Sequence, residues 1–318
     1  MGSGMEIKKN SILLSVVVPC FNEQEVIRDF YSRLTSCLKN INASAEIIFI
    51  DDGSCDRTFN IIQELHHHDN RVVGISLNRN FGHQAAVTAG LQNCKGDAVI
   101  VIDADLQDPP EIIPEMIEKW QGGADVVYAT RLKRPGESVF KLFTAALFYA
   151  ILNYLSGTKI PLNTGDFRLM DRKIVDVLNS MRETHKFIRG MVSWIGGTQI
   201  PIYYNREPRL KGYSKYPFLK MLKFAIDAIT SFSIKPLKIM SVTAIFIIAG
   251  ACAGSLCLII IKFVNPSIFI PGYPPIILAI AFFGGIQLFS IGVLGEYIGR
   301  IFEQSKTRPI YIIKEILK

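Results

Sequence analysis

The sequence predicts an α/β fold with a mostly parallel sheet, followed by a membrane-associated region. Three observations support this expectation. Short β-branched apolar runs alternate with helical patterns from the start of the chain. Acidic and polar residues directly follow several of these runs. Two long stretches near the end of the chain contain no charged residue.

Five apolar runs have the composition of buried strands, because parallel strands covered on both faces are apolar throughout. Helical patterns separate them, including an alanine-rich stretch at 82–93, and two prolines at 109 and 110 open a further helix. Residues 198–204 predict one more strand, whereas 163–172 form a polar turn before a short apolar run. The tail at 309–316 fits a strand or a helix. The five predicted strands are Leu13–Pro19, Ala45–Ile50, Val72–Leu77, Val99–Ile102 and Asp125–Thr130.

Polar clusters follow three of these strands at the point where each strand ends. Parallel sheets bind ligands at the carboxyl ends of their strands, so three clusters on one edge predict a site. If extended geometry continues to Asp105, its carboxylate and that of Asp103 share one side and suit a hard divalent cation that also binds a phosphate ester. The alternative is that these aspartates only cap the next helix. The clusters are Asn22 with Glu23, Asp51 with Asp52, and Asp103 with Asp105.

Composition excludes several other classes of protein. No dinucleotide-binding glycine fingerprint follows the first strand, and no Walker-type loop occurs. The net charge of +7 comes with high hydrophobicity and no nucleic-acid-binding motif. We therefore expect a membrane protein that faces an anionic surface and binds no nucleic acid. Six scattered cysteines without a Cys-X-X-Cys pair indicate reduced thiols in the cytoplasm.

Two spans in the last part of the chain are long enough to cross a bilayer. Ile239–Ile261 and Phe263–Gly295 contain no charged residue, and prolines and glycine at 271–275 separate the two spans. Basic residues lie before the first span and after the second, but none lies between 263 and 275. The positive-inside rule then predicts a multi-pass protein of the inner membrane with its catalytic domain and both termini in the cytoplasm. Two buried core helices are the alternative.

Apolar residues at helical spacing also precede the first span. Apolar residues form one stripe within 216–233, and the lysines of this segment lie outside the stripe. This pattern predicts an amphipathic helix that lies in the membrane interface. A similar pattern at 139–155 fits a core helix as well as a membrane-surface helix. We expect a tag-like, disordered start at 1–10, a cytoplasmic domain at 11–210, an interfacial region at 211–235, two transmembrane helices at 236–300 and a cytoplasmic tail at 301–318.

Four motifs together resemble a family-2 glycosyltransferase: VVVPCFNE at 16–23, DDGS at 51–54, DADLQDPPE at 103–111 and GDFRLMDR at 165–172. The branch is similar to the polyprenyl-phosphate glycosyltransferases, which include dolichyl-phosphate mannose synthases and bacterial undecaprenyl-phosphate glucosyltransferases. The resemblance runs from about Ser15 to Tyr204, and two following spans fit the bacterial members. It implies a GT-A-like, Rossmann-type domain.

The resemblance also implies roles for individual residues. Asp103, Asp105 and Gln107 would hold Mg²⁺ or Mn²⁺, and Arg131 and Lys141 would approach the acceptor phosphate. Leu142 and Ala145 replace the arginine and serine that relatives often carry, which makes Lys211, Ser214 and Lys215 further acceptor-phosphate candidates. The residues implied for catalysis are Asp105, Arg131 and Asp166. Those implied for nucleotide binding are Pro19, Asn22, Glu23, Asp51, Asp52 and Asp103.

Asp166 aligns with the catalytic-base region of the family. It would orient sugar hydroxyls or a basic side chain, abstract a proton, or only cap a turn. An ionised lipid phosphate needs positioning more than it needs a base, which favours an orienting role.

The implied activity is inverting transfer of one sugar, glucose from UDP-glucose, to polyprenyl (undecaprenyl) phosphate at the cytoplasmic face of the membrane. The donor would be a UDP- or GDP-linked sugar, and we expect a homo-oligomer. One alternative keeps the donor chemistry but uses a glycolipid or polysaccharide acceptor. Another is a catalytically silent membrane scaffold.

Overall fold

The computed structural model describes residues 12–132, 164–205, 233–264 and 273–318, apart from residues 40, 42 and 185. These residues form two compact units. Unit 1 contains the described residues up to 205 together with 308–318, and unit 2 contains 233–264 and 273–307. The predicted start at 1–10 and the two helical patterns at 139–155 and 216–233 therefore lie outside the described residues, except for Ser233.

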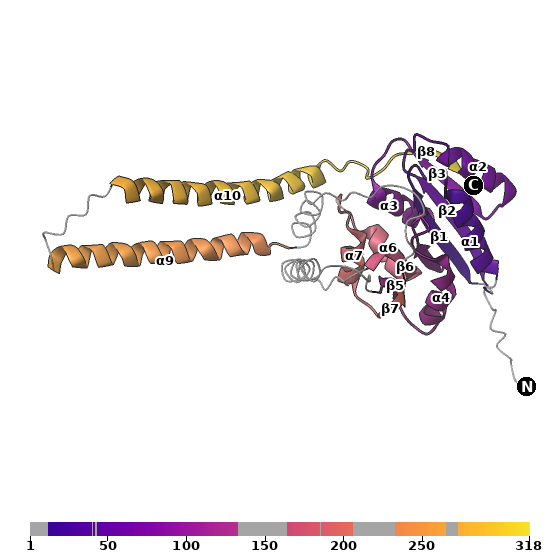
Figure 1. The fold of residues 1–318 in the computed structure, drawn as a ribbon, viewed down its shortest axis with the longest axis horizontal. Coiled ribbons are helices and arrows are strands. Elements are labelled where there is room, and N and C mark those ends of the chain that lie inside the picture. Colours follow the sequence, from indigo (N-terminus) through magenta and orange to yellow (C-terminus); the bar gives the residue numbers. More distant parts are fainter. Residues whose placement is uncertain are drawn as a thin grey trace, which may run out of the picture. The chain divides into compact units, whose positions relative to one another are not determined.

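Unit 1 is built on a mixed sheet whose strand order is β7-β5-β6-β4-β1-β2-β3-β8 (Figure 1). All five strands predicted from apolar runs are present, with ends that shift by no more than one residue, and so is the strand predicted at 198–204. The strands are β1 (Leu13–Cys20), β2 (Ser44–Asp51), β3 (Val72–Leu77), β4 (Ala98–Val101), β5 (Val126–Arg131), β6 (Thr164–Asp171), β7 (Gln199–Tyr204) and β8 (Ile313–Leu317).

Strand β6 was not predicted, because the sequence at 163–172 suggested a polar turn before a short apolar run. It pairs antiparallel with both β4 and β5, in the interior of the sheet. Strands β1 to β4 are parallel to one another, and β5 and β7 share their direction. The start of β6 consequently lies at the same edge as the carboxyl ends of the parallel strands.

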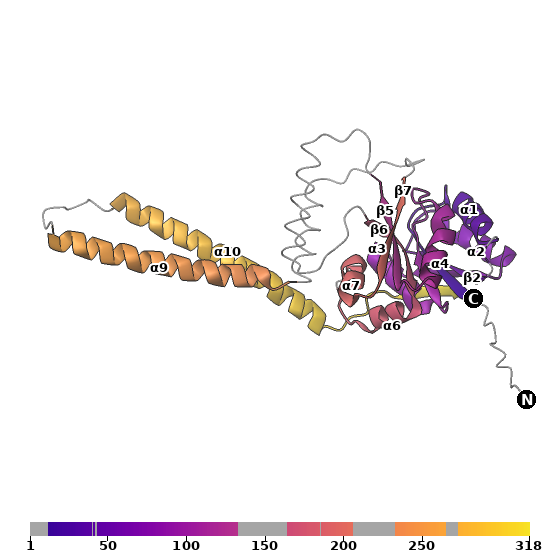
Figure 2. The same ribbon diagram turned by 90° about the horizontal axis from the view of Figure 1, so that it is seen from below.

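Helices cover both faces of this sheet, with α1, α2 and α4 on one face and α3, α6 and α7 on the other (Figures 1 and 2). Helix α3 lies close to the sheet because its buried face consists largely of alanine together with Gly90. A Cβ atom at Gly90 would lie 2.3 Å from a methyl group of Val17. The helices are α1 (Ile27–Lys39), α2 (Thr58–His68), α3 (His83–Asn93), the short 3₁₀ helix η1 (Pro110–Ile112), α4 (Ile113–Gln121), α6 (Arg172–Ser180) and α7 (Ile188–Ile195).

The tail, for which the sequence fitted a strand or a helix, forms the edge strand β8. It pairs antiparallel with β3, with Leu317 opposite Gly74. A Cβ atom at Gly74 would lie 2.8 Å from a methyl group of Leu317, so the glycine leaves room for this side chain. The backbone N–H of Asn78 extends the pairing by donating to Ile312.

Unit 2 consists, in its described part, of two long apolar helices, α9 (Lys235–Val264) and α10 (Tyr273–Ser305), which run side by side (Figures 1 and 2). The Tyr297 hydroxyl donates to the Ser233 carbonyl at 2.6 Å and links the start of α9 to the end of α10. By length and composition both helices could cross a membrane. None of either apolar window is buried, which disagrees with the alternative of two buried core helices.

Candidate active site

The loops after β1 and β2 lie against each other at the carboxyl edge of the sheet. The backbone N–H of Asn22 donates to Ser54 Oγ at 2.9 Å, and the Asn22 side-chain oxygen accepts from the Cys55 N–H at 2.9 Å. The N–H of Glu23 donates to Thr58 Oγ1 at 2.8 Å. Pro19, inside β1, pairs in register with Ile50 of β2. The structure therefore brings together the first two polar clusters.

Asp51 and Asp52 are buried and support these loops. The Asp52 oxygens accept the backbone N–H groups of Phe81 at 2.7 Å and Gly82 at 2.9 Å, which fixes the start of α3. Asp51 accepts from the Ser54 N–H at 3.2 Å and the Ser76 hydroxyl at 3.3 Å. Their contact with a nucleotide stays a prediction, as does that of Pro19, Asn22 and Glu23.

The geometric expectation for Asp103 and Asp105 is wrong, because β4 ends at Val101 and the chain turns at residues 104 and 105. Leu106 has a φ of 59°, and Asp105 Oδ1 accepts the Gln107 N–H at 3.1 Å. The two carboxylates thus come from a tight loop and not from an extended strand.

Asp103 has an unsatisfied oxygen atom in this loop. Its Oδ1 atom is buried and accepts no hydrogen bond from the described residues. Burial raises the pKa of Asp103 to about 6, and the nearby His83 opposes this shift only in part. The fold thus keeps a carboxylate where it lacks a hydrogen-bond donor, which is typical of ligand sites.

These carboxylates fit a divalent cation that is shared with a diphosphate. Within the part of the chain that the structure describes, no three His, Cys, Asp or Glu side chains converge on a metal position. Mg²⁺ often takes only one or two carboxylates and completes its octahedron with substrate phosphates and water. The buried, unsatisfied Oδ1 of Asp103 matches such a ligand. Gln107 is a buried residue of this loop, and its role as a third ligand stays a prediction.

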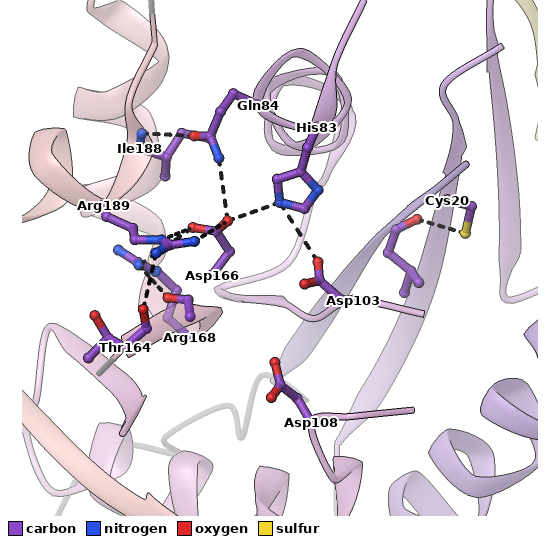
Figure 3. Close-up of polar contacts among 12 residues, drawn as sticks. Cys20, His83, Gln84, Asp103, Asp108, Thr164, Asp166, Arg168, Ile188 and Arg189 are labelled. Carbon is purple, nitrogen blue, oxygen red and sulfur yellow. Dashed lines mark hydrogen bonds and ion pairs between the residues drawn. The ribbon is translucent and has the colours of Figure 1, made fainter. Parts of the chain in front are cut away.

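Asp166 lies opposite Asp103 because of the register of β6. Val101, the last residue of β4, pairs with Arg168, so residues before 168 extend beyond the end of β4. The Asp166 side chain is only 6% exposed. His83 Nε2 lies 3.0 Å from its Oδ2 atom, and Gln84 Nε2 also donates to Oδ2 at 3.4 Å. Arg189 of α7 donates from Nε to Oδ1 at 2.8 Å and from Nη2 to Oδ2 at 3.2 Å (Figure 3).

This network fixes the charges on its members. Burial by itself lowers the pKa of His83, but the hydrogen bond to Asp166 and the charge of Asp103 raise it to about 9. Burial raises the pKa of Asp166, yet the hydrogen bond from His83 and the Arg189 guanidinium outweigh it and hold this pKa well below its usual range. His83 Nε2 is also 3.7 Å from Asp103 Oδ1. A protonated imidazole therefore lies between the two aspartates (Figure 3).

Arg131, at the end of β5, belongs to a second cluster on the same edge. Its Nε donates to the Tyr204 hydroxyl at 3.1 Å, and its Nη2 lies 3.6 Å from Asp108 Oδ1. The Tyr204 hydroxyl donates to that same Asp108 oxygen. The other residues predicted to bind the acceptor phosphate lie outside the described residues: Lys141, Lys211, Ser214 and Lys215.

Sequence reasoning missed several residues of these two clusters. His83 opens the predicted helix after the third strand, and Asp108 stands inside DADLQDPPE, so strand-end logic could have found both. Tyr204 ends a predicted strand. Arg189 gave no signal, because only the packing of α7 brings it to Asp166.

Known proteins resemble the chain along most of its length. Glycosyl transferase family 2 matches residues 15–178. The uncharacterized glycosyltransferase YkcC of Bacillus subtilis (strain 168) is 46% identical, over 96% of this chain and 94% of its own. The bactoprenol glucosyl transferase of Shigella phage SfV is 45% identical, over 95% and 98%. The prophage bactoprenol glucosyl transferase homolog of Escherichia coli (strain K12) is 44% identical, over 96% and 99%. The chain belongs to glycosyl transferase family 2, and its resemblance to the bactoprenol enzymes agrees with the polyprenyl-phosphate branch.

Proposed function

We propose that the chain transfers a single glucose from UDP-glucose to undecaprenyl phosphate at the cytoplasmic face of the inner membrane, with inversion at the anomeric carbon. The observation that carries this proposal is the buried, unsatisfied Asp103 oxygen beside Asp105, with Arg131 on the same edge. This edge of the sheet suits a cation-bound diphosphate at the two aspartates and an anionic acceptor at Arg131. Relatives that match over nearly their whole length are named bactoprenol glucosyl transferases, which supports the lipid acceptor and the sugar.

The donor side of the reaction needs charge neutralisation. A bound Mg²⁺ or Mn²⁺ would stabilise the negative charge on the departing diphosphate. Asp103 and Asp105 would hold that ion, with Gln107 as a third ligand. Pro19, Asn22, Glu23, Asp51 and Asp52 would shape the pocket for the base and ribose at the ends of β1 and β2.

The acceptor side needs positioning. A lipid phosphate is already anionic at neutral pH, so its oxygen attacks the anomeric carbon without a general base once it is held in line. Arg131 would bind this phosphate, together with Lys141, Lys211, Ser214 and Lys215. Asp166 acts as an orienting group, since both of its oxygens already accept hydrogen bonds from His83, Gln84 and Arg189.

Helices α9 and α10 would anchor the enzyme in the bilayer. Lys235 and Lys238 begin α9, Arg300 lies in the last turns of α10, and the Tyr297–Ser233 hydrogen bond joins these ends. The connection at 265–272 has no basic residue, so the positive-inside rule favours cytoplasmic termini. Helix α10 is about 50 Å long and exceeds the roughly 30 Å hydrocarbon core. Its charged end from Glu296 onward would extend into the cytoplasmic interface.

The proposal is tested with the full chain in detergent micelles that contain undecaprenyl phosphate. A panel of UDP- and GDP-linked sugars is added with Mg²⁺ or Mn²⁺, and mass spectrometry identifies the lipid products. We expect one hexose on the lipid phosphate with UDP-glucose, and none after the cations are chelated. Formation of no sugar-phosphate lipid with any donor would refute the proposal. Transfer to an added glycolipid alone would favour the second acceptor class.

A further inference from the structure

Arg131 is held by two buried side chains that sequence reasoning did not single out. Asp108 is 1% exposed and Tyr204 is 5% exposed, whereas the Arg131 side chain is 24% exposed. The Tyr204 hydroxyl stands between the other two, because it accepts from Arg131 Nε and donates to Asp108 Oδ1. The buried carboxylate and hydroxyl therefore fix the inner part of a guanidinium that still reaches solvent.

Gly165 determines where this guanidinium lies. A Cβ atom at Gly165 would lie 2.8 Å from Arg131 Nη2 and 3.6 Å from Asp108 Oδ2. Because residue 165 is a glycine, the Arg131 guanidinium can lie directly against strand β6, at the position just before Asp166. Any larger side chain would push the guanidinium away.

The charges of this cluster are complementary. Burial and the Asp108 carboxylate raise the pKa of Tyr204, so its hydroxyl keeps the proton that it donates. Asp108 faces the positive Arg131 at 3.6 Å, which compensates the loss of hydration of a carboxylate that is almost fully buried. Removing either partner would leave the other without this compensation and free Arg131 to adopt other rotamers.

We propose that Asp108 and Tyr204 are positioning residues that hold Arg131 in the orientation that binds the acceptor phosphate. This inference rests on the proposed function, in which Arg131 contacts the lipid phosphate. Asp108 directly follows Gln107, in the loop that begins at Asp103. One short loop would therefore position the donor diphosphate through its carboxylates and the acceptor phosphate through Arg131.

The chain contains a matched control for this cluster. Tyr31 donates to Asp69 Oδ2 at 2.7 Å, and Arg71 Nη2 donates to the same oxygen at 2.8 Å. This set has the same three residue types, but Asp69 lies before β3, at the opposite edge of the sheet. Tyr31→Phe removes one tyrosine–aspartate hydrogen bond without touching the candidate site.

The test compares Tyr204→Phe, Gly165→Ala and Tyr31→Phe with the wild type. Steady-state transfer is measured with the lipid phosphate and the nucleotide sugar varied separately, and thermal unfolding checks the fold. Loss of the two hydrogen bonds of the Tyr204 hydroxyl should raise the Michaelis constant for the lipid phosphate about tenfold and leave that for the donor unchanged. Gly165→Ala should do the same, since its Cβ displaces only the flexible end of Arg131. Tyr31→Phe should change neither constant.

Binding of geranyl phosphate, measured by calorimetry on the full chain without a donor, gives an independent readout. We expect weaker binding in Tyr204→Phe and Gly165→Ala than in the wild type and Tyr31→Phe. Unchanged acceptor constants and unchanged binding in both site variants would overturn the inference, as would an equal rise in the donor constant. An inactive wild type would instead refute the proposed function, and the binding data would still decide whether Asp108 and Tyr204 position Arg131 for a phosphate.

Discussion

Aspartates lie at both edges of the sheet in unit 1, but their surroundings differ. At the amino edge, the hydrogen bonds from Arg71 hold the pKa of Asp69 well below its usual range, and those from Lys173 and Thr198 lower the pKa of Asp125. At the carboxyl edge, burial raises the pKa of Asp103 to about 6, and one of its oxygens accepts no hydrogen bond from the described residues.

The difference distinguishes Asp103, the predicted metal ligand, from the structural aspartates of the amino edge. Ionised aspartates at the amino edge stabilise the fold, because folding supplies their partners. Ionised Asp103 opposes folding, since its pKa is raised above the usual value for an aspartate. A fold retains such a carboxylate where a ligand binds the unsatisfied oxygen. The unsatisfied oxygen of Asp103 therefore indicates the position of the site better than a count of acidic residues does.

Replacing the metal-side carboxylates should produce the largest effect. Asp103→Asn and Asp105→Asn should each reduce sugar transfer on the order of 1000-fold, because the charge on the departing diphosphate loses its compensation. The melting temperature of Asp103→Asn should not fall, since the pKa of Asp103 is raised and the variant removes a charge whose Oδ1 atom is buried without a hydrogen bond from the described residues. Transfer assays and calorimetry of the same preparations measure both. Wild-type activity in Asp105→Asn would place the cation elsewhere.

Asp166→Asn should reduce both the stability of the fold and the rate of sugar transfer. It removes the charged partner of Arg189 and His83, so we expect the free energy of unfolding to fall by about 3 kcal/mol. Transfer should fall about 100-fold, because these two basic groups lose their orientation. Chemical denaturation and transfer assays test the pair of effects. A free energy of unfolding equal to that of the wild type would contradict the role of Asp166 as the partner of these two basic groups.

The smallest effect is expected at the amino edge. Asp69→Asn should lower the free energy of unfolding by about 1 kcal/mol at pH 7 and leave transfer unchanged. The folded-state pKa of Asp69 is lowered, so its contribution is present above the usual aspartate pKa and disappears as the pH falls through the lower, folded-state value. The difference in the free energy of unfolding between wild type and variant should therefore begin to shrink below about pH 4 and disappear at more acidic pH. A constant difference down to the most acidic conditions would contradict this assignment.

The sequence made most of the sheet predictable, since parallel strands such as Val72–Leu77 are continuous apolar runs. Strand β6 was missed for a physical reason. Along one face it places Asp166 and Arg168, two buried charged residues 3.9 Å apart, where an interior strand normally carries apolar side chains. An apolar sequence pattern therefore does not identify an interior strand that carries buried charged residues paired with one another. Strand β8 stayed ambiguous because it is short, partly exposed and lies at an edge.

The candidate site was predictable where it depends on strand ends, as at Asp51 and Asp103. It was not predictable where a helix packs a distant side chain against the edge, as α7 does with Arg189. The role of Asp52 shows a third limit. A carboxylate at a strand end suggests a ligand contact, but nothing in the sequence indicates that the Asp52 oxygens also accept two backbone N–H groups and fix the start of α3.

The pairing of β8 with β3 affects how the protein is made. Strand β3 leaves the ribosome early, whereas its neighbour β8 follows both apolar helices in the chain. During synthesis the outer edge of β3 remains unpaired until α9 and α10 have emerged. The sheet of unit 1 can therefore be completed only after the two apolar helices have been translated.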